Sequence, residues 1–144
     1  MRLGSRLLLC FTILWLTFTL VFFGVISVLI YRTPAFALGL GWFHTQGNDG
    51  LLVTISNVVL VLAGLVLWLL HRRIGAWILL FYSAFWTANF GWAVLKIVPT
   101  IVRHRVVVCS GGTCDSLPIA VAVVAGFTLC GVWSLLQVLH RRVP

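Results

Sequence analysis

The feature that most constrains this chain is a series of four long apolar segments, at residues 7–31, 51–70, 74–98 and 117–139. Each has the roughly 20 residues that a helix needs to cross a bilayer core about 30 Å thick. Lys96 is the one charged residue within them, and it stands near a segment end, where its amine can reach the interface. We therefore expect an all-α integral membrane protein in which residues 1–144 form a single domain of four transmembrane helices.

Composition agrees with a lipid bilayer as the surroundings of the chain. Hydrophobic residues make up 62% of the sequence and charged residues 8%, against about 45–50% and about 25% in soluble domains. The net charge of +8 would suggest a nucleic-acid partner in a soluble protein. Here the cations flank apolar segments, so we expect no nucleic-acid partner.

Arginines indicate the orientation. Six of the nine stand in pairs beside apolar segments: Arg2 and Arg6, Arg72 and Arg73, Arg141 and Arg142. The two longer loops, residues 32–50 and 99–116, hold the other three. The positive-inside rule then places both termini in the cytoplasm and arranges the helices as two antiparallel hairpins. We expect a bacterial inner (plasma) membrane, since the chain is compact and its first segment is too long for a cleaved signal.

A cysteine pair marks the second outer loop. Cys109 and Cys114 stand on either side of a Gly-Gly pair, after three valines that favour an extended strand. A small outer loop closed by a disulfide is sterically reasonable, and it would persist on an oxidising face of the membrane. Two free loop thiols are the alternative.

Groups suited to catalysis or metal binding are few. Asp49 and Asp115 are the two acidic side chains, and each precedes an apolar segment, where it can cap a helix. No carboxylate is available inside a segment for proton transfer or hydrolysis. The histidines lie in loops or at helix ends: His44, His71, His104 and His140. We expect no catalytic residue, metal or cofactor, although the sequence leaves an enzymatic role open.

Polar and small residues inside the segments indicate helix packing. Asn57 and Asn89 lie at similar depths, about 9 and 13 Å from the outer ends of their helices, so we expect an interhelical hydrogen bond between them. A polar ligand-binding spot is the alternative. Small residues recur at every fourth position on the third and fourth segments, which favours packing of these two helices: Ser83, Thr87 and Gly91; Ala122, Gly126, Cys130 and Ser134.

Aromatic residues indicate two further surfaces. The first segment carries aromatic side chains at helical spacing, which face lipid or dock against a partner's membrane helix: Phe11, Trp15, Phe18 and Phe22. A deeper cluster around Trp86 either packs between helices or binds a quinone head group or a lipid tail. Arg103, His104 and Arg105 make the second outer loop the other candidate for a partner contact.

Three functional classes follow. The first is a small accessory subunit, assembly factor or immunity-type protein that binds another membrane protein. The second is a quinone-linked thiol oxidoreductase: the four-helix layout and the outer cysteine pair resemble the membrane proteins that reoxidise disulfide-forming catalysts, although the first outer loop lacks the second cysteine pair of that family. The third is a homo-oligomeric channel or transporter of small solutes or lipids, without the membrane-embedded Glu of the small multidrug exporters.

Overall fold

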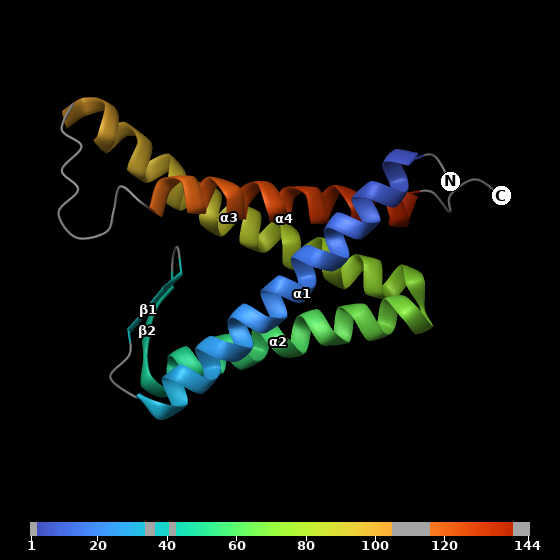
Figure 1. The fold of residues 1–144 in the computed structure, drawn as a ribbon, viewed down its shortest axis with the longest axis horizontal. Coiled ribbons are helices and arrows are strands. Elements are labelled where there is room, and N and C mark those ends of the chain that lie inside the picture. The colour runs from blue at the N-terminus through green and yellow to red at the C-terminus, as the bar shows by residue number, and fades with distance from the viewer. Residues whose placement is uncertain (1–2, 34–36, 41–42, 105–115, 140–144) are drawn as a thin grey trace.

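Four long helices make up most of the structure. The computed structural model describes residues 3–33, 37–40, 43–104 and 116–139. Its helices are α1 (Leu3–Arg32), α2 (Gly47–Leu70), α3 (Arg72–His104) and α4 (Ser116–Leu139) (Figure 1). All four are long and apolar enough to cross a membrane. The chain therefore has the four-helix membrane-type fold that the apolar segments predict.

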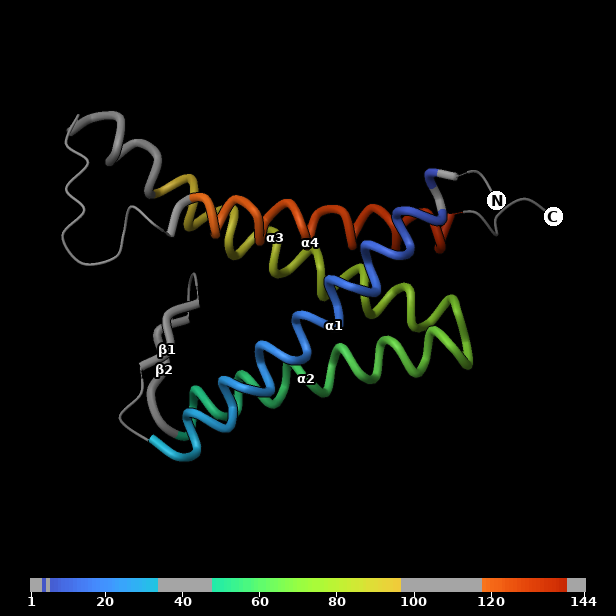
Figure 2. Tube along the Cα trace, in the orientation of Figure 1, coloured from blue at the N-terminus to red at the C-terminus, as the bar shows by residue number. Residues whose placement is uncertain are grey.

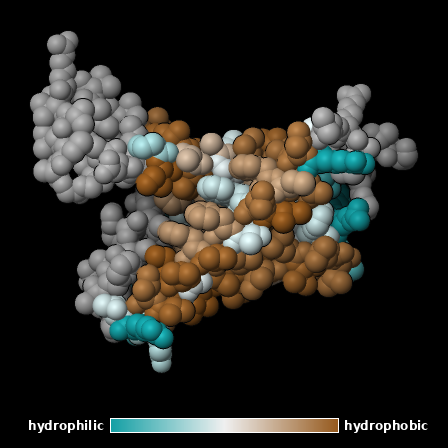
Figure 3. All heavy atoms as spheres, in the orientation of Figure 1, coloured by the Kyte–Doolittle hydropathy of each residue, from teal (hydrophilic) through white to brown (hydrophobic). Residues whose placement is uncertain are grey.

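The outer surface of the helices is largely apolar. At most 28% of the most apolar stretch of each helix is buried within the protein, and apolar side chains cover much of the face shown in Figure 3. A surface of this kind would be unstable in water. In a bilayer it is solvated by lipid tails, which makes the chain an integral membrane protein.

The connection between α1 and α2 contains a β-hairpin, which the prediction of helices alone missed. Strands β1 (Ala37–Leu40) and β2 (Phe43–Gln46) pair antiparallel, with Leu40 opposite Phe43. This apolar stretch is too short to span the bilayer. Strand pairing gives its backbone N–H and C=O groups hydrogen-bond partners without a helix.

A single residue, His71, separates α2 from α3. Its N–H donates to the carbonyl of Leu67 at 2.6 Å, and its own carbonyl accepts from the N–H of Ile74 at 2.9 Å. Gly75 permits the tight junction, because a Cβ there would overlap backbone atoms of Trp68 on α2. From this junction the two helices diverge (Figure 2).

The third helix is longer than the sequence analysis predicted. It continues through Pro99 to His104, whereas the predicted segment stopped at residue 98. Proline removes one backbone hydrogen bond, and membrane helices tolerate this loss where neighbouring groups make it good. Near this end the Lys96 ammonium lies 5.3 Å from the centroid of the Trp92 ring.

An aromatic core joins α1, α3 and α4. The most extensive interface lies between α3 and α4, while α2 packs about equally against α1 and α3. Trp86 of α3 lies at the centre of the core and is 1% exposed. Its ring centroid lies 5.7 Å from that of Phe23, 5.3 Å from that of Phe90 and 6.2 Å from that of Phe127. Residues of α1, α3 and α4 are thereby held together in one cluster.

Candidate functional site between α2 and α3

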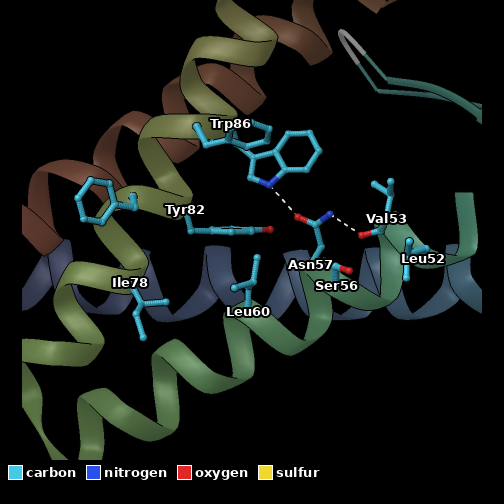
Figure 4. Close-up of a pocket in the computed structure, with 10 residues that line it drawn as sticks. Leu52, Val53, Ser56, Asn57, Leu60, Ile78, Tyr82 and Trp86 are labelled. Carbon is cyan, nitrogen blue, oxygen red and sulfur yellow. Dashed lines mark hydrogen bonds between the residues drawn. The ribbon is translucent and has the colours of Figure 1, made fainter. Parts of the chain in front are cut away.

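The strongest candidate site begins with a hydrogen bond that crosses from α3 to α2. The indole Nε1 of Trp86 donates to Oδ1 of Asn57 at 2.7 Å. The Nδ2 of Asn57 donates in turn to the carbonyl of Val53, one turn earlier on α2, also at 2.7 Å. Both ends of the amide therefore have a partner, and the side chain is fixed in one orientation (Figure 4).

A groove with a volume of about 560 Å³ opens beside this hydrogen bond. Asn57, Tyr82 and Trp86 form its buried floor, whereas Phe81 and Phe85 are exposed at its rim. Other residues of the same two helices complete the lining: Leu52, Val53, Ser56, Leu60 and Ile78. The size falls within the range of small-molecule sites.

The Tyr82 hydroxyl is the polar group of the floor that has no partner. Tyr82 is 6% exposed, and its hydroxyl makes no hydrogen bond within the described part of the chain. It points from α3 toward α2, beside Asn57 (Figure 4). The neighbouring Trp86 N–H donates to Asn57 instead. A buried hydroxyl in this condition retains the full cost of its desolvation.

The groove lies deep in the membrane-spanning part of the helices. Tyr82 lies ten residues after Arg72, the first residue of the α3 span. Asn57 lies nine residues after Asn48, the first residue of the α2 span. Each side chain is therefore about 14–15 Å from the start of its own span. None of the described residues that line the groove is charged. Its chemistry is therefore that of hydrogen bonding and stacking with a neutral ligand.

Asn57 was predicted as a polar contact between helices, whereas its bond with Trp86 was not anticipated. The sequence predicts a bond between the amides of Asn57 and Asn89, and Asn89 is fully buried on α3. That bond stays a prediction, while Trp86 is a partner of Asn57 that was not anticipated. A signal existed in the sequence, since Trp86 lies at nearly the depth of Asn89 and a buried indole N–H needs an acceptor.

The predicted small-residue stripes serve two interfaces. Ser83 of α3 is fully buried, and a Cβ at Gly131 of α4 would lie 3.5 Å from its Cβ. Gly126 faces α1 instead, because a Cβ there would overlap the Trp15 indole. A Cβ at Gly91 would meet nothing within 4 Å in the described structure.

The remaining stripe residues are divided between the core and the surface. Cys130 and Ser134 are buried in α4, Thr87 is half-buried, and Ala122 is exposed. The Ser134 hydroxyl donates to the Cys130 carbonyl at 2.9 Å. The inward positions of α4 thus include three of its four predicted stripe residues: Gly126, Cys130 and Ser134.

The aromatic residues of α1 divide between the interior and the outer surface. Phe11 and Trp15 are half-buried, and the Trp15 ring meets Phe127 of α4 edge-on at 5.5 Å. Phe18 is 57% exposed and Phe22 is 38% exposed. Together with Trp15 they border a second hollow, of about 220 Å³, between α1 and α4.

The predicted loop and terminal residues are only partly described. Arg6, Arg72 and Arg73 are exposed, and Arg103 and His104 fall in the last turn of α3. The other predicted positions lie outside the described residues: Arg2, Arg105, Cys109, Cys114, Arg141 and Arg142. Two cysteines are described as free thiols, Cys10 exposed on α1 and Cys130 buried on α4.

A metal centre finds no support in the described residues, which contain no group of three or more His, Cys, Asp or Glu side chains placed to hold an ion. Comparison with known proteins adds no family. No protein-family model, no curated protein and no solved structure matches the chain. Any function must therefore be argued from the site itself.

Proposed function

We propose that this protein acts by binding another membrane protein, as an accessory subunit, assembly factor or immunity-type protein. The observation that carries the proposal is the apolar hollow between α1 and α4, with Phe18 and Phe22 exposed at its edge. It lies on the aromatic face of the first segment, the surface for which the sequence suggests a partner helix.

Helix association in lipid explains why a hollow matters more than an apolar surface. Lipid tails are as apolar as a leucine side chain, so burial of apolar area alone does not favour one helix over lipid. A depression that accepts a side chain from a neighbouring helix gains close packing that mobile lipid tails provide less well. Trp15 also borders the hollow, and its buried N–H has no acceptor within the described part of the chain.

The test is native mass spectrometry of the tagged protein after mild purification from its own membrane. We expect a stoichiometric second protein, and we expect the double substitution Phe18→Ala and Phe22→Ala to remove it. Phe81→Ala is the matched control, because Phe81 is also a largely exposed phenylalanine but lies at the α2–α3 groove. A mass that corresponds to this chain alone, or to a homo-oligomer of it, would contradict the proposal. It would favour a thiol oxidoreductase or a transporter instead.

The orientation of the chain belongs to the same proposal. Both termini lie in the cytoplasm of a bacterial cell, and the helices form two antiparallel hairpins in its inner membrane. The second outer loop carries a disulfide between Cys109 and Cys114. The support for these statements is the distribution of arginines and the spacing of the two cysteines.

A further inference from the structure

We propose that the α2–α3 groove binds a neutral, membrane-dissolved molecule whose flat ring carries a carbonyl oxygen, which is the chemistry of a quinone head group. The groove lies apart from the α1–α4 hollow used above and does not depend on the accessory role. No electron transfer is implied, because the inference concerns binding alone.

The free hydrogen-bonding group of the floor defines what the ligand must offer. Asn57 uses its carbonyl oxygen for Trp86 and its amide N–H for Val53. The Tyr82 hydroxyl is left as a buried donor at the groove floor that has no acceptor within the described residues. A ligand with an acceptor oxygen would satisfy it and offset its desolvation.

Aromatic side chains along α3 favour a flat ligand. Phe81, Tyr82, Phe85 and Trp86 all line the groove. Planar conjugated rings stack on such faces or meet their edges at centroid separations of about 4.5–7 Å. The α2 side, from Leu52 to Leu60, extends about 12 Å along the helix axis. A ring fits this length, whereas an entire partner helix would need a longer groove.

Depth and charge exclude a phospholipid head group as the occupant. The groove floor lies about 15 Å along α3 from Arg72, and none of its described lining residues is charged. A phosphate drawn to this depth would lose its hydration without gaining a cation. A lipid tail could enter, but it would leave the Tyr82 hydroxyl without a partner. A neutral ring carbonyl needs no cation at this depth, and it can accept the hydrogen bond of the Tyr82 hydroxyl.

The experiment uses the full chain in phosphatidylcholine nanodiscs and a decyl-substituted benzoquinone with ¹³C-labelled carbonyls. Hydrogen bonding lowers a carbonyl stretching frequency, and the label separates the quinone band from the lipid ester bands in the infrared. We expect a shifted band that saturates at one quinone per protein. Decylbenzene, which has the same tail without the carbonyls, should compete poorly.

The decisive variant is Tyr82→Phe. We expect it to lose the shifted band and to weaken binding about tenfold, the factor that corresponds to one hydrogen bond. Tyr31→Phe is the matched control, since Tyr31 is the other tyrosine and is 77% exposed at the end of α1. Leu60→Trp, which fills the groove from its rim, should also abolish binding.

Folding does not confound this test, because Tyr82→Phe removes a hydroxyl that has no partner and should not lower the melting temperature. The inference is overturned if no saturable shifted band forms, or if the band survives in Tyr82→Phe. Equal competition by decylbenzene would also overturn it, since the groove would then recognise an apolar tail alone.

Discussion

Among single residues, Trp86 does two things at once: its ring centres the aromatic core, and its N–H supplies the bond to Asn57. A polar group buried among apolar side chains is costly only when it lacks a partner. The contribution of this bond is therefore best measured by removing one partner and then both.

Trp86→Phe keeps an aromatic ring but leaves the Asn57 oxygen without its donor. We expect a loss of about 1–2 kcal/mol in the free energy of unfolding, measured in mixed micelles by titration with a denaturing detergent. Adding Asn57→Leu should recover part of that loss. Trp77→Phe, at a partly exposed position on the same helix, is the control. If the loss in the double variant equals the sum of the losses in Trp86→Phe and Asn57→Leu measured singly, the bond contributes nothing to stability.

Glycines of α3 provide a second test at this scale. Gly75→Ala would place a methyl group against the α2 backbone at Trp68, which cannot move as a flexible side chain can. We expect a loss of about 2–3 kcal/mol, seen as a lower thermal midpoint by circular dichroism. Gly91→Ala meets open space and should range from neutral to about 1 kcal/mol stabilising. Equal changes in stability for Gly75→Ala and Gly91→Ala would show that α3 does not approach the α2 backbone closely at Gly75.

Between elements, the contact of α1 with α4 includes a close approach at one glycine, Gly126. Trp15 lies over Gly126, and its ring packs edge-on against Phe127. The contact thus places a half-buried indole on a residue that has no side chain, a combination that lets two helices approach with a large ring between them.

Gly126→Ala should displace the Trp15 ring and loosen α1 from α4. We expect a loss of about 1–2 kcal/mol, with faster unfolding when denaturing detergent is added in a stopped-flow experiment. Gly131→Ala is the matched control on the same helix, because its added Cβ would make only an ordinary contact with Ser83. Similar rates for the two variants would argue against close packing of Trp15 on α4.

For the whole molecule, orientation and oxidation state can be read together from thiol labelling in intact cells or spheroplasts. A membrane-impermeant maleimide added from outside should label Cys109 and Cys114 only after reduction. The variant Cys109→Ser should expose one reactive thiol without reductant, since its former partner is then free. Cys10→Ser with Cys130→Ser serves as the background control. Labelling only after the membrane is permeabilised would contradict the proposed orientation.

Sequence patterns and structure agree best where one physical requirement dominates. Four helices were predictable because the need to satisfy every backbone group in lipid leaves few alternatives. The hairpin at β1 and β2 and the continuation of α3 through Pro99 were not, because local propensity is overridden there by the surroundings. The groove was only half predictable: Asn57 stands out in an apolar segment, whereas the role of Tyr82 depends on which side of α3 faces α2.

The short junction at His71 also has a mechanical consequence. With one residue between them and backbone contact at Gly75, α2 and α3 cannot slide past each other, and the relative motion that this junction leaves open is a change in the angle between them. A swing of about 5° displaces Tyr82, about 15 Å along α3, by about 1 Å, and the far end of α2 by about 3 Å. The bond from Trp86 to Asn57 joins the same two helices beside the groove, so a change of this size would stretch it, and the bond limits how far the groove can widen.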